Sequence, residues 1–181
     1  MTPSDNSAAA PHADMATAGI VHIGIGAFHR AHQAVYTDVA MQAKGGNWRI
    51  LGVSLRSTDI VDALNAQDSA FTVIERHPDG PKARRITSLS KAIAASRDVA
   101  QVLDALADPE IRIVTITVTE KAYGIDRVSG TVQAEHPAVK HDLAYPATPT
   151  GLLGILVAGL KRRKQAGIRP FTIVSCDNLP S

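Results

Sequence analysis

Residues 20–38 constrain the fold of this chain more than any other stretch, and they read IVHIGIGAFHRAHQAVYTD. The first part is rich in β-branched residues, which are typical of a buried parallel strand. Gly24 and Gly26 then allow the backbone to turn sharply, and apolar residues at helical spacing follow. A strand, a Gly-x-Gly turn and a helix start predict a phosphate site, because first-turn N–H groups and the helix dipole favour negative charge.

The short pattern does not by itself separate a phosphate site from an ordinary tight turn, because His29 stands where the dinucleotide fingerprint has its third glycine. The longer string GIGAFHRAHQA resembles the opening motif of the long-chain polyol and sugar-acid dehydrogenases, a family that includes mannitol 2-dehydrogenase and fructuronate reductase. The resemblance implies that this string binds NAD or NADP. The cofactor-contacting residues that it implies are Ile23, Gly24, Ile25, Gly26, Ala27, Phe28, His29 and Arg30.

The composition is that of one globular domain, with 45% apolar and 20% charged residues in 181. The net charge is +2 and the basic residues are dispersed, which argues against a nucleic-acid partner. The exception is the run KRRK at 161–164, which we interpret as a solvated helix end. The longest apolar run, 151–160, is far short of the roughly 20 residues of a membrane helix.

We expect residues 1–18 to be a disordered leader and residues 19–181 to be the dinucleotide-binding domain. The leader lacks both a basic start and a continuous apolar segment, so it does not resemble a signal peptide. A single cysteine, Cys176, excludes an internal disulfide and favours a reducing compartment. We therefore predict a cytoplasmic location.

The order of predicted elements indicates an α/β fold with a doubly wound, mostly parallel Rossmann-type sheet and an inserted β-hairpin. Further strands are expected at 48–55, 111–118 and 171–176, and helices at 30–42, 60–65, 98–107, 138–143 and 152–165. The hairpin is expected to pair 71–76 with 83–89 across the turn HPDGP.

The end of the second predicted strand has two open interpretations. Its polar residues could cap the next helix, or they could face the adenosine ribose, where a carboxylate binds the 2′-hydroxyl and an arginine accepts a 2′-phosphate. The candidates are Asp59 for the ribose and Arg56 for the phosphate. The carboxylate makes NAD the expected preference.

The loop after the strand at 111–118 reads TEKAYG, beginning at Thr119. It could be a solvated polar turn, but it resembles the family segment at the nicotinamide end of the cofactor. The resemblance implies that Thr119 contacts the cofactor, that Glu120 is catalytic and that Lys121 binds the substrate. An ammonium at Lys121 would pair with a sugar-acid carboxylate, which favours fructuronate-type substrates over neutral polyols.

The last predicted strand is followed by SCDNLP. Cys176 has no evident histidine partner, so we interpret it as a small packed residue rather than a nucleophile. The segment resembles the family segment that enters the substrate site, which implies that Asn178 is catalytic and substrate-binding. An amide donor there stabilises negative charge on the reacting oxygen without itself ionising.

Seven histidines raise the question of a metal, but their spacing shows no ligand motif, and we predict none. The resemblance extends from about residue 20 to 180. It implies an oxidoreductase that interconverts a polyol or aldonate secondary alcohol with a ketose or keto-acid, in a protein whose second, helical domain carries the catalytic lysine. Because no such domain follows in this chain, we expect a truncated enzyme or one domain of it, inactive alone. A non-catalytic nucleotide-binding module and a structural domain are the alternatives.

Overall fold

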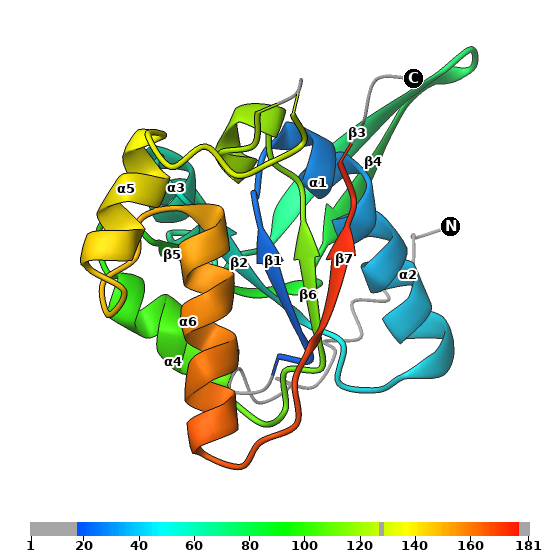
Figure 1. Ribbon diagram of the computed structural model, residues 1–181. Coiled ribbons are helices and arrows are strands. Elements are labelled where there is room, and N and C mark those ends of the chain that lie inside the picture. Colours follow the sequence, from blue (N-terminus) through cyan, green and yellow to red (C-terminus); the bar gives the residue numbers. More distant parts are fainter. Residues whose placement is uncertain (1–17, 127–128, 178–181) are drawn as a thin grey trace, which may run out of the picture.

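The computed structural model describes residues 18–126 and 129–177. Five strands form one parallel sheet in the order β5-β2-β1-β6-β7, with β1 at its centre (Figure 1). They are β1 (Ile20–Ile23), β2 (Ile50–Ser54), β5 (Leu89–Ala94), β6 (Ile113–Ile116) and β7 (Thr172–Ser175). The chain therefore starts in the middle of the sheet and winds outward to one edge and then to the other. The predicted doubly wound α/β fold is confirmed.

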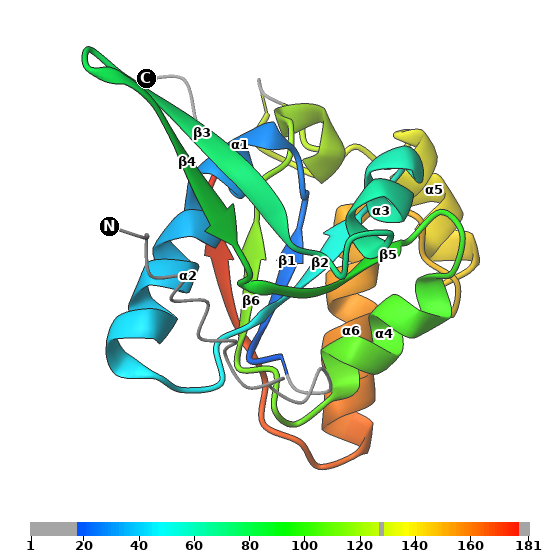
Figure 2. The same ribbon diagram turned by 180° about the vertical axis from the view of Figure 1, so that it is seen from behind.

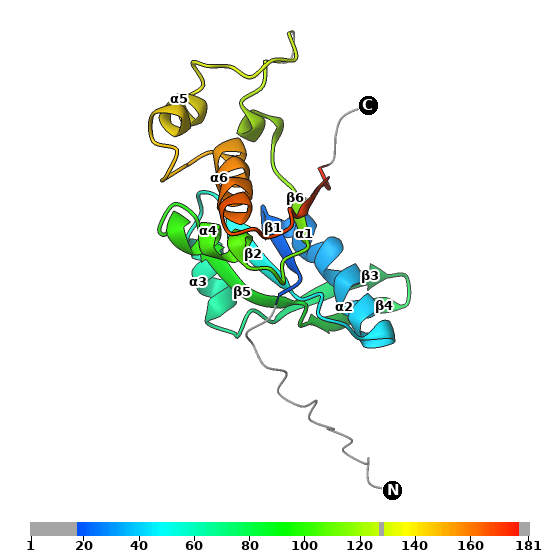
Figure 3. The same cartoon turned by 60° about the horizontal axis from the view of Figure 1, so that its bottom comes forward.

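Helices cover both faces of the sheet (Figure 3). One face carries α2 (Gln33–Lys44) and α3 (Asp59–Asn65), and the other carries α4 (Val99–Ala107) and α6 (Leu152–Gln165). The two apolar cores follow the alternation of side chains along each strand. Val21 and Ile23 pack on the α4 and α6 side, whereas Ile20 packs on the side of α2 and α3. Among the described residues, no helix has the length and apolar character needed to cross a membrane.

The inserted hairpin consists of β3 (Phe71–His77) and β4 (Gly80–Ile86), paired antiparallel, and it projects beyond the sheet (Figure 2). The hairpin is confirmed, but the prediction that its second strand extends to Leu89 is wrong. Leu89 instead begins β5, which pairs with β2 and completes the parallel sheet. The sequence of β5, LSKAIA, has one β-branched residue, Ile93, so propensity did not separate it from the hairpin.

The first helix is interrupted, contrary to the single helix predicted for 30–42. It consists of α1 (Ala27–Ala31) and α2, separated by His32 in a non-helical conformation. The ring of His32 lies between Phe28 and Tyr36, at 5.2 and 5.1 Å between ring centroids. No proline or glycine marks this break, so the sequence pattern did not reveal it. The end of α2 at Gly45, with φ +66°, is as predicted.

The interpretation of the KRRK run as a solvated face is wrong for one of its members. Arg163 is 2% exposed and lies on the inner side of α6. Its guanidinium donates to the carbonyl oxygens of four residues, and its neighbours Arg162 and Lys164 are less buried. The acceptors are Leu106, Asp108, Ile111 and Arg169. Arg163 therefore joins the end of α4 to the start of β6 and the turn after α6.

The short elements η1 (Glu120–Tyr123) and α5 (Pro137–Ala144) lie between β6 and α6, at the carboxyl edge of the sheet (Figure 1). Ala18, which the sequence assigned to the leader, is 8% exposed and belongs to the core on the α4 and α6 side.

Candidate nucleotide site

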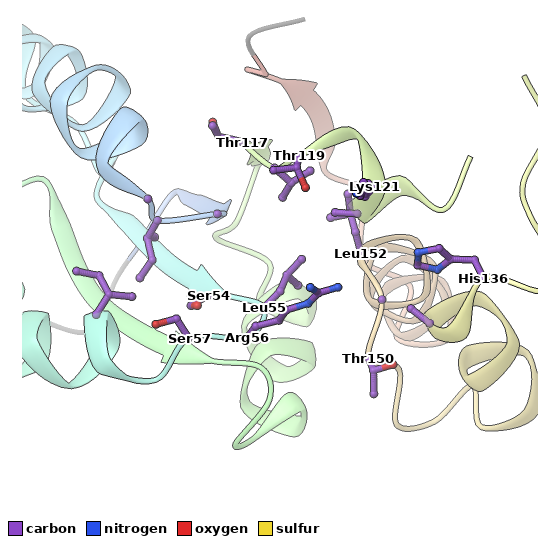
Figure 4. Close-up of a pocket in the computed structure, with 18 of the residues that line it drawn as sticks. Ser54, Leu55, Arg56, Ser57, Thr117, Thr119, Lys121, His136, Thr150 and Leu152 are labelled. Carbon is purple, nitrogen blue, oxygen red and sulfur yellow. The ribbon is translucent and has the colours of Figure 1, made fainter. Parts of the chain in front are cut away.

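A cavity of about 720 Å³ opens where β1, β2 and β6 end (Figure 4). This is the edge at which parallel α/β sheets bind ligands, and β1 and β6 are the neighbours from which the chain winds in opposite directions. The lining residues are Gly24, Ile25, Gly26, Arg30, Ser54, Leu55, Arg56, Ser57, Ile60, Thr117, Val118, Thr119, Lys121, Ala122, His136, Ala138, Thr150, Gly151 and Leu152.

Gly24 and Gly26 serve different purposes in the turn after β1. Gly24 has φ +110°, and a Cβ there would lie 1.9 Å from the carbonyl oxygen of Thr117. The close approach of the β1 and β6 exits therefore requires glycine at this position. Gly26 has φ −66°, and a Cβ there would meet nothing within 4 Å. The fold itself does not require glycine at 26, and the space beside it belongs to the cavity.

The start of α1 faces the same cavity. Its first-turn N–H groups have no acceptor inside the helix, which suits them to an anion. Arg30 adds a guanidinium that lines the cavity while its Nη1 donates to the carbonyl oxygen of Ile25 at 2.7 Å. Gly26 N–H is used within the turn, because it donates to the carbonyl oxygen of Gly24 at 2.7 Å.

Two of the predicted cofactor residues, Ile23 and His29, are not among the residues that line the cavity. The side chains of Ile23 and His29 are both fully buried, so neither presents a side chain to the cavity. Ile23 packs in the core beneath α4 and α6, and His29 stacks on His22 beneath the turn. Ala27 opens α1 at an exposed position, and Phe28 is 48% exposed and faces a neighbouring cavity.

The two residues predicted to set the nucleotide preference, Arg56 and Asp59, are placed differently relative to the cavity. Arg56 lines the cavity and extends from the end of β2 into its space (Figure 4). Asp59 is exposed at the first position of α3 and does not line the cavity. The N-cap residue of α3 is Thr58, which makes no side-chain capping hydrogen bond. The structure therefore does not support the cap interpretation for Thr58, and the ribose contact of Asp59 stays a prediction.

A second cavity of about 750 Å³ adjoins the first on the β6 side. Thr117, Val118, Thr119 and Lys121 border both cavities. Glu120, at the start of η1, lines only the second of the two. A ligand that fills the first cavity can therefore meet a second molecule beside the loop that follows β6.

Asp177 holds the two loops of this second cavity together, and the sequence reasoning missed it. One carboxylate oxygen accepts from Val118 N at 2.6 Å, and the other accepts from the hydroxyl groups of Tyr123 and Ser175. Burial, and then the Asp177 carboxylate, raise the pKa of Tyr123. The available signal was the position of Asp177 next to Asn178. Asn178 itself lies outside the described residues.

The wall opposite β2 is built by α5 and the start of α6, which the sequence reasoning did not assign to the site. Asp142 accepts from Thr150 N at 2.7 Å and from Gly151 N at 2.9 Å. Its carboxylate thereby fixes the loop that begins α6, and this loop lines the cavity. Within residues 18–126 and 129–177, no three metal-ligating side chains gather as a metal site would require.

Comparison with known proteins decides the family. The family model described as the mannitol dehydrogenase Rossmann domain matches residues 18–181. This chain belongs to that family. The resemblance seen in the sequence motifs is thereby confirmed for this mannitol dehydrogenase Rossmann domain.

Individual members of the family show how far the likeness extends. The mannitol 2-dehydrogenase of Cereibacter sphaeroides is 47% identical over 167 residues, which are 91% of this chain and 35% of that protein. The uncharacterized oxidoreductase YeiQ of Escherichia coli K12 is 42% identical over 89% of this chain and 33% of its own length. The solved ternary complex of Pseudomonas fluorescens mannitol 2-dehydrogenase with NAD and D-mannitol superposes with a TM-score of 0.85 at 45% identity, over 94% of this chain and 36% of that one. This chain therefore spans about a third of the length of the relatives that it matches.

Proposed function

We propose that this chain is the nicotinamide-nucleotide-binding part of a dehydrogenase that interconverts a secondary alcohol of a polyol or aldonate with a ketose or keto-acid. The observation that carries the proposal is Gly26. Its missing side chain is unexplained by the fold, yet it opens the backbone to a cavity at the switch point of the sheet. A polyphosphate brought close to that backbone explains it.

The residues at the cavity fit a dinucleotide. A volume of about 720 Å³ lies within the range of small-molecule sites. The start of α1 and Arg30 would hold the pyrophosphate, and the β2 end with Arg56 and Ile60 would hold the adenosine half. Thr117 and Thr119 would hold the nicotinamide half. When bound, the nucleotide supplies the hydride acceptor or donor of the reaction. A preference for NAD is proposed on the Asp59 carboxylate, which is exposed at the first position of α3, outside the lining of the cavity.

The second cavity is the proposed substrate site, because it shares residues 117–119 and Lys121 with the first. Glu120 lines it, and Asn178 follows directly after Asp177, whose side chain also lines it. An amide donor at Asn178 would hold the reacting oxygen as it gains charge. Lys121 is exposed there, so a sugar-acid carboxylate could pair with it, which supports a fructuronate-type substrate beside the polyols.

The general base that removes the alcohol proton is expected to come from residues beyond this chain. Among the groups at the second cavity, Tyr123 is bound to the Asp177 carboxylate and its pKa is raised, which makes it a poor base. The aligned part of this chain covers 35% of the mannitol 2-dehydrogenase of Cereibacter sphaeroides, and the resemblance implies a lysine in the remaining part of such relatives. The 181 residues alone should therefore bind nucleotide without turnover. The single cysteine favours a reducing compartment, so we propose a cytoplasmic location.

The test is a fluorescence titration of NADH and NADPH against the protein and its Gly26→Val variant. A valine at 26 meets no protein atom at its Cβ, so the variant should fold, but it fills the space of the pyrophosphate. We expect NADH affinity to fall more than about tenfold, or ~1.4 kcal/mol. Ala40→Val, on the exposed side of α2, is the control that should bind normally. Equal dissociation constants for Gly26→Val and the unsubstituted protein would refute the proposal.

A further inference from the structure

A buried polar cluster lies directly beneath the Gly-x-Gly turn. It contains His22 of β1, Thr115 of β6, His29 of α1 and Gln33 of α2. His22 and His29 are fully buried and Thr115 is 5% exposed. His22 and Thr115 are register partners on adjacent strands, so their side chains share the face that α2 covers. Buried polar groups are costly unless they are hydrogen-bonded, so this cluster needs an explanation.

The hydrogen bonds fix one tautomer of His22. Its Nε2 lies 3.2 Å from the carbonyl oxygen of Gly24, which can only accept, so Nε2 carries the proton. Nδ1 is then an acceptor, and the Thr115 hydroxyl donates a hydrogen bond to it, with 2.7 Å between Oγ1 and Nδ1. The Thr115 oxygen in turn accepts from Gln33 Nε2 at 3.0 Å. The three hydrogen bonds therefore donate in one direction: Gln33 donates to Thr115, Thr115 donates to His22, and His22 donates to the carbonyl oxygen of Gly24.

His29 holds the ring of His22 from the other side. The two rings stack with centroids 3.5 Å apart and planes 15° from parallel. Neither ring nitrogen of His29 has a hydrogen-bond partner among the described residues. Burial lowers the pKa of both rings, so they stack as neutral groups. The stack covers one face of the buried His22 ring and leaves it little freedom to tilt.

The accepting carbonyl of Gly24 decides where the next N–H group points. A trans peptide directs its C=O and N–H to opposite sides. Because the Gly24 oxygen accepts from His22 Nε2 and also from Gly26 N–H at 2.7 Å, the N–H of Ile25 is directed to the opposite side of the peptide, away from His22. Ile25 lines the first cavity. If the Gly24–Ile25 peptide flipped, the Gly24 carbonyl oxygen would face a pyrophosphate in this cavity in place of the Ile25 N–H donor.

We propose that His22 is a positioning residue for nucleotide binding: its Nε2–H holds the Gly24 carbonyl inward and so aims the Ile25 N–H at the pyrophosphate. The inference rests on the proposed nucleotide site, but its geometric half concerns the free protein. The other buried residues of the cluster set the tautomer and orientation of His22.

The first test needs no nucleotide. Nitrogen-15 NMR of the histidine rings should show His22 as the Nε2–H tautomer, and an Nδ1–H tautomer would overturn the inference. Thr115→Val removes the hydroxyl that donates to Nδ1 but keeps the Gly24 carbonyl, so the ring should stay Nε2–H while its Nδ1 resonance shifts. Thr115→Ser should restore the original Nδ1 resonance. An unchanged Nδ1 resonance in Thr115→Val would show that Thr115 does not hold His22.

The second test uses NADH titration to compare a donor at the Nε2 position of the His22 ring with a donor at the Nδ1 position. His22→Gln places an amide N–H near the Nε2 position, whereas His22→Asn places one near Nδ1 and leaves Gly24 without this donor. We expect His22→Asn to weaken NADH binding by about three- to tenfold and His22→Gln to stay near the unsubstituted value. Equal affinities for the two variants would overturn the inference.

Ser88→Ala is the matched control, because it removes a buried hydrogen bond, to the carbonyl oxygen of Ala34 at 2.7 Å, away from the turn. It should leave the NADH affinity unchanged, and a loss equal to that of His22→Asn would show that general destabilisation is measured. If the unsubstituted protein binds no nucleotide, the proposed function fails, and the tautomer experiment still tests the hydrogen-bond chain separately.

Discussion

Replacing Arg163 with methionine should destabilise the fold more than most single substitutions. The guanidinium donates to four carbonyl oxygens at 2.6–3.0 Å, and the ring of Phe171 lies 5.5 Å away. Methionine keeps much of the stem but supplies no donor. Asp108 and Arg169 are exposed residues, so their carbonyl oxygens can form hydrogen bonds with water instead. Leu106 and Ile111 are 0% and 2% exposed, so their carbonyls would lose their partner in a dry environment.

The expected cost follows from these two carbonyls. Leaving a buried acceptor unpaired costs about 1–3 kcal/mol, so two of them give about 2–6 kcal/mol. We therefore expect the free energy of unfolding to fall by about 2–6 kcal/mol, a large part of what a domain of this size has.

Arg162→Met is the matched control on the adjacent residue. Arg162 forms one ion pair with Asp104, at 2.5 Å, and that carboxylate is 73% exposed. An exposed pair contributes at most about 1 kcal/mol, so this variant should stay near the unsubstituted protein. Urea unfolding followed by the fluorescence of Trp48, the single tryptophan, measures both variants. If Arg163→Met costs no more than Arg162→Met, the assignment of Arg163 as a buried tie between α4, β6 and α6 is refuted.

Three further predictions concern the pH response, the α6 start and nucleotide choice. The pKa is lowered from 6.5 to about 4 for His22 and to about 2 for His29, so the unfolded state binds more protons below pH 6.5. Stability is therefore fully present above that pH and lost as pH falls, by about 4 kcal/mol in total between pH 7.5 and pH 5, and an unchanged urea midpoint at pH 5 would contradict this. Asp142→Ala should lower the free energy of unfolding by about 2 kcal/mol and speed amide exchange at Thr150 and Gly151, whereas Glu135→Ala, at an exposed ion pair, should do neither in the same hydrogen-exchange experiment. Asp59→Ala should shift the NAD/NADP affinity ratio toward NADP in a titration with both nucleotides, and an unchanged ratio would remove Asp59 from the ribose site.

The parts of the fold that the sequence predicted are those with strong local signals. The β-branched run before Gly24 identified the central strand, and the run IRIVTITV at 111–118 identified β6. The apolar period and the following glycine placed α6 at Leu152–Gln165 without error. The strand β5 was missed because its alanines and Lys91 carry no strand preference, so tertiary pairing with β2 decides its conformation.

The site residues also divide into those marked by a local motif and those that only tertiary contacts bring into place. The glycine turn and the loops after β2 and β6 were found because motifs mark them, and Gly26, Arg56 and Lys121 do lie at the cavity. Asp142 and Asp177 act through backbone N–H groups on other segments, the latter 59 residues from Val118. Partners of this kind, from 8 to 59 residues apart along the chain, leave no recognisable motif. The same holds for His22, whose hydroxyl partner Thr115 lies 93 residues away.

The most direct test of the central claim is to map nucleotide binding on the protein by amide chemical shifts. NAD is added stepwise to the nitrogen-15-labelled protein, and the shift of each assigned amide is followed. The account predicts the largest changes at residues 24–30, 54–57 and 117–121, with the projecting hairpin at 71–86 unaffected. Changes concentrated in the apolar cavity between α5 and α6, around Leu143 and Val157, or no changes at all, would contradict it.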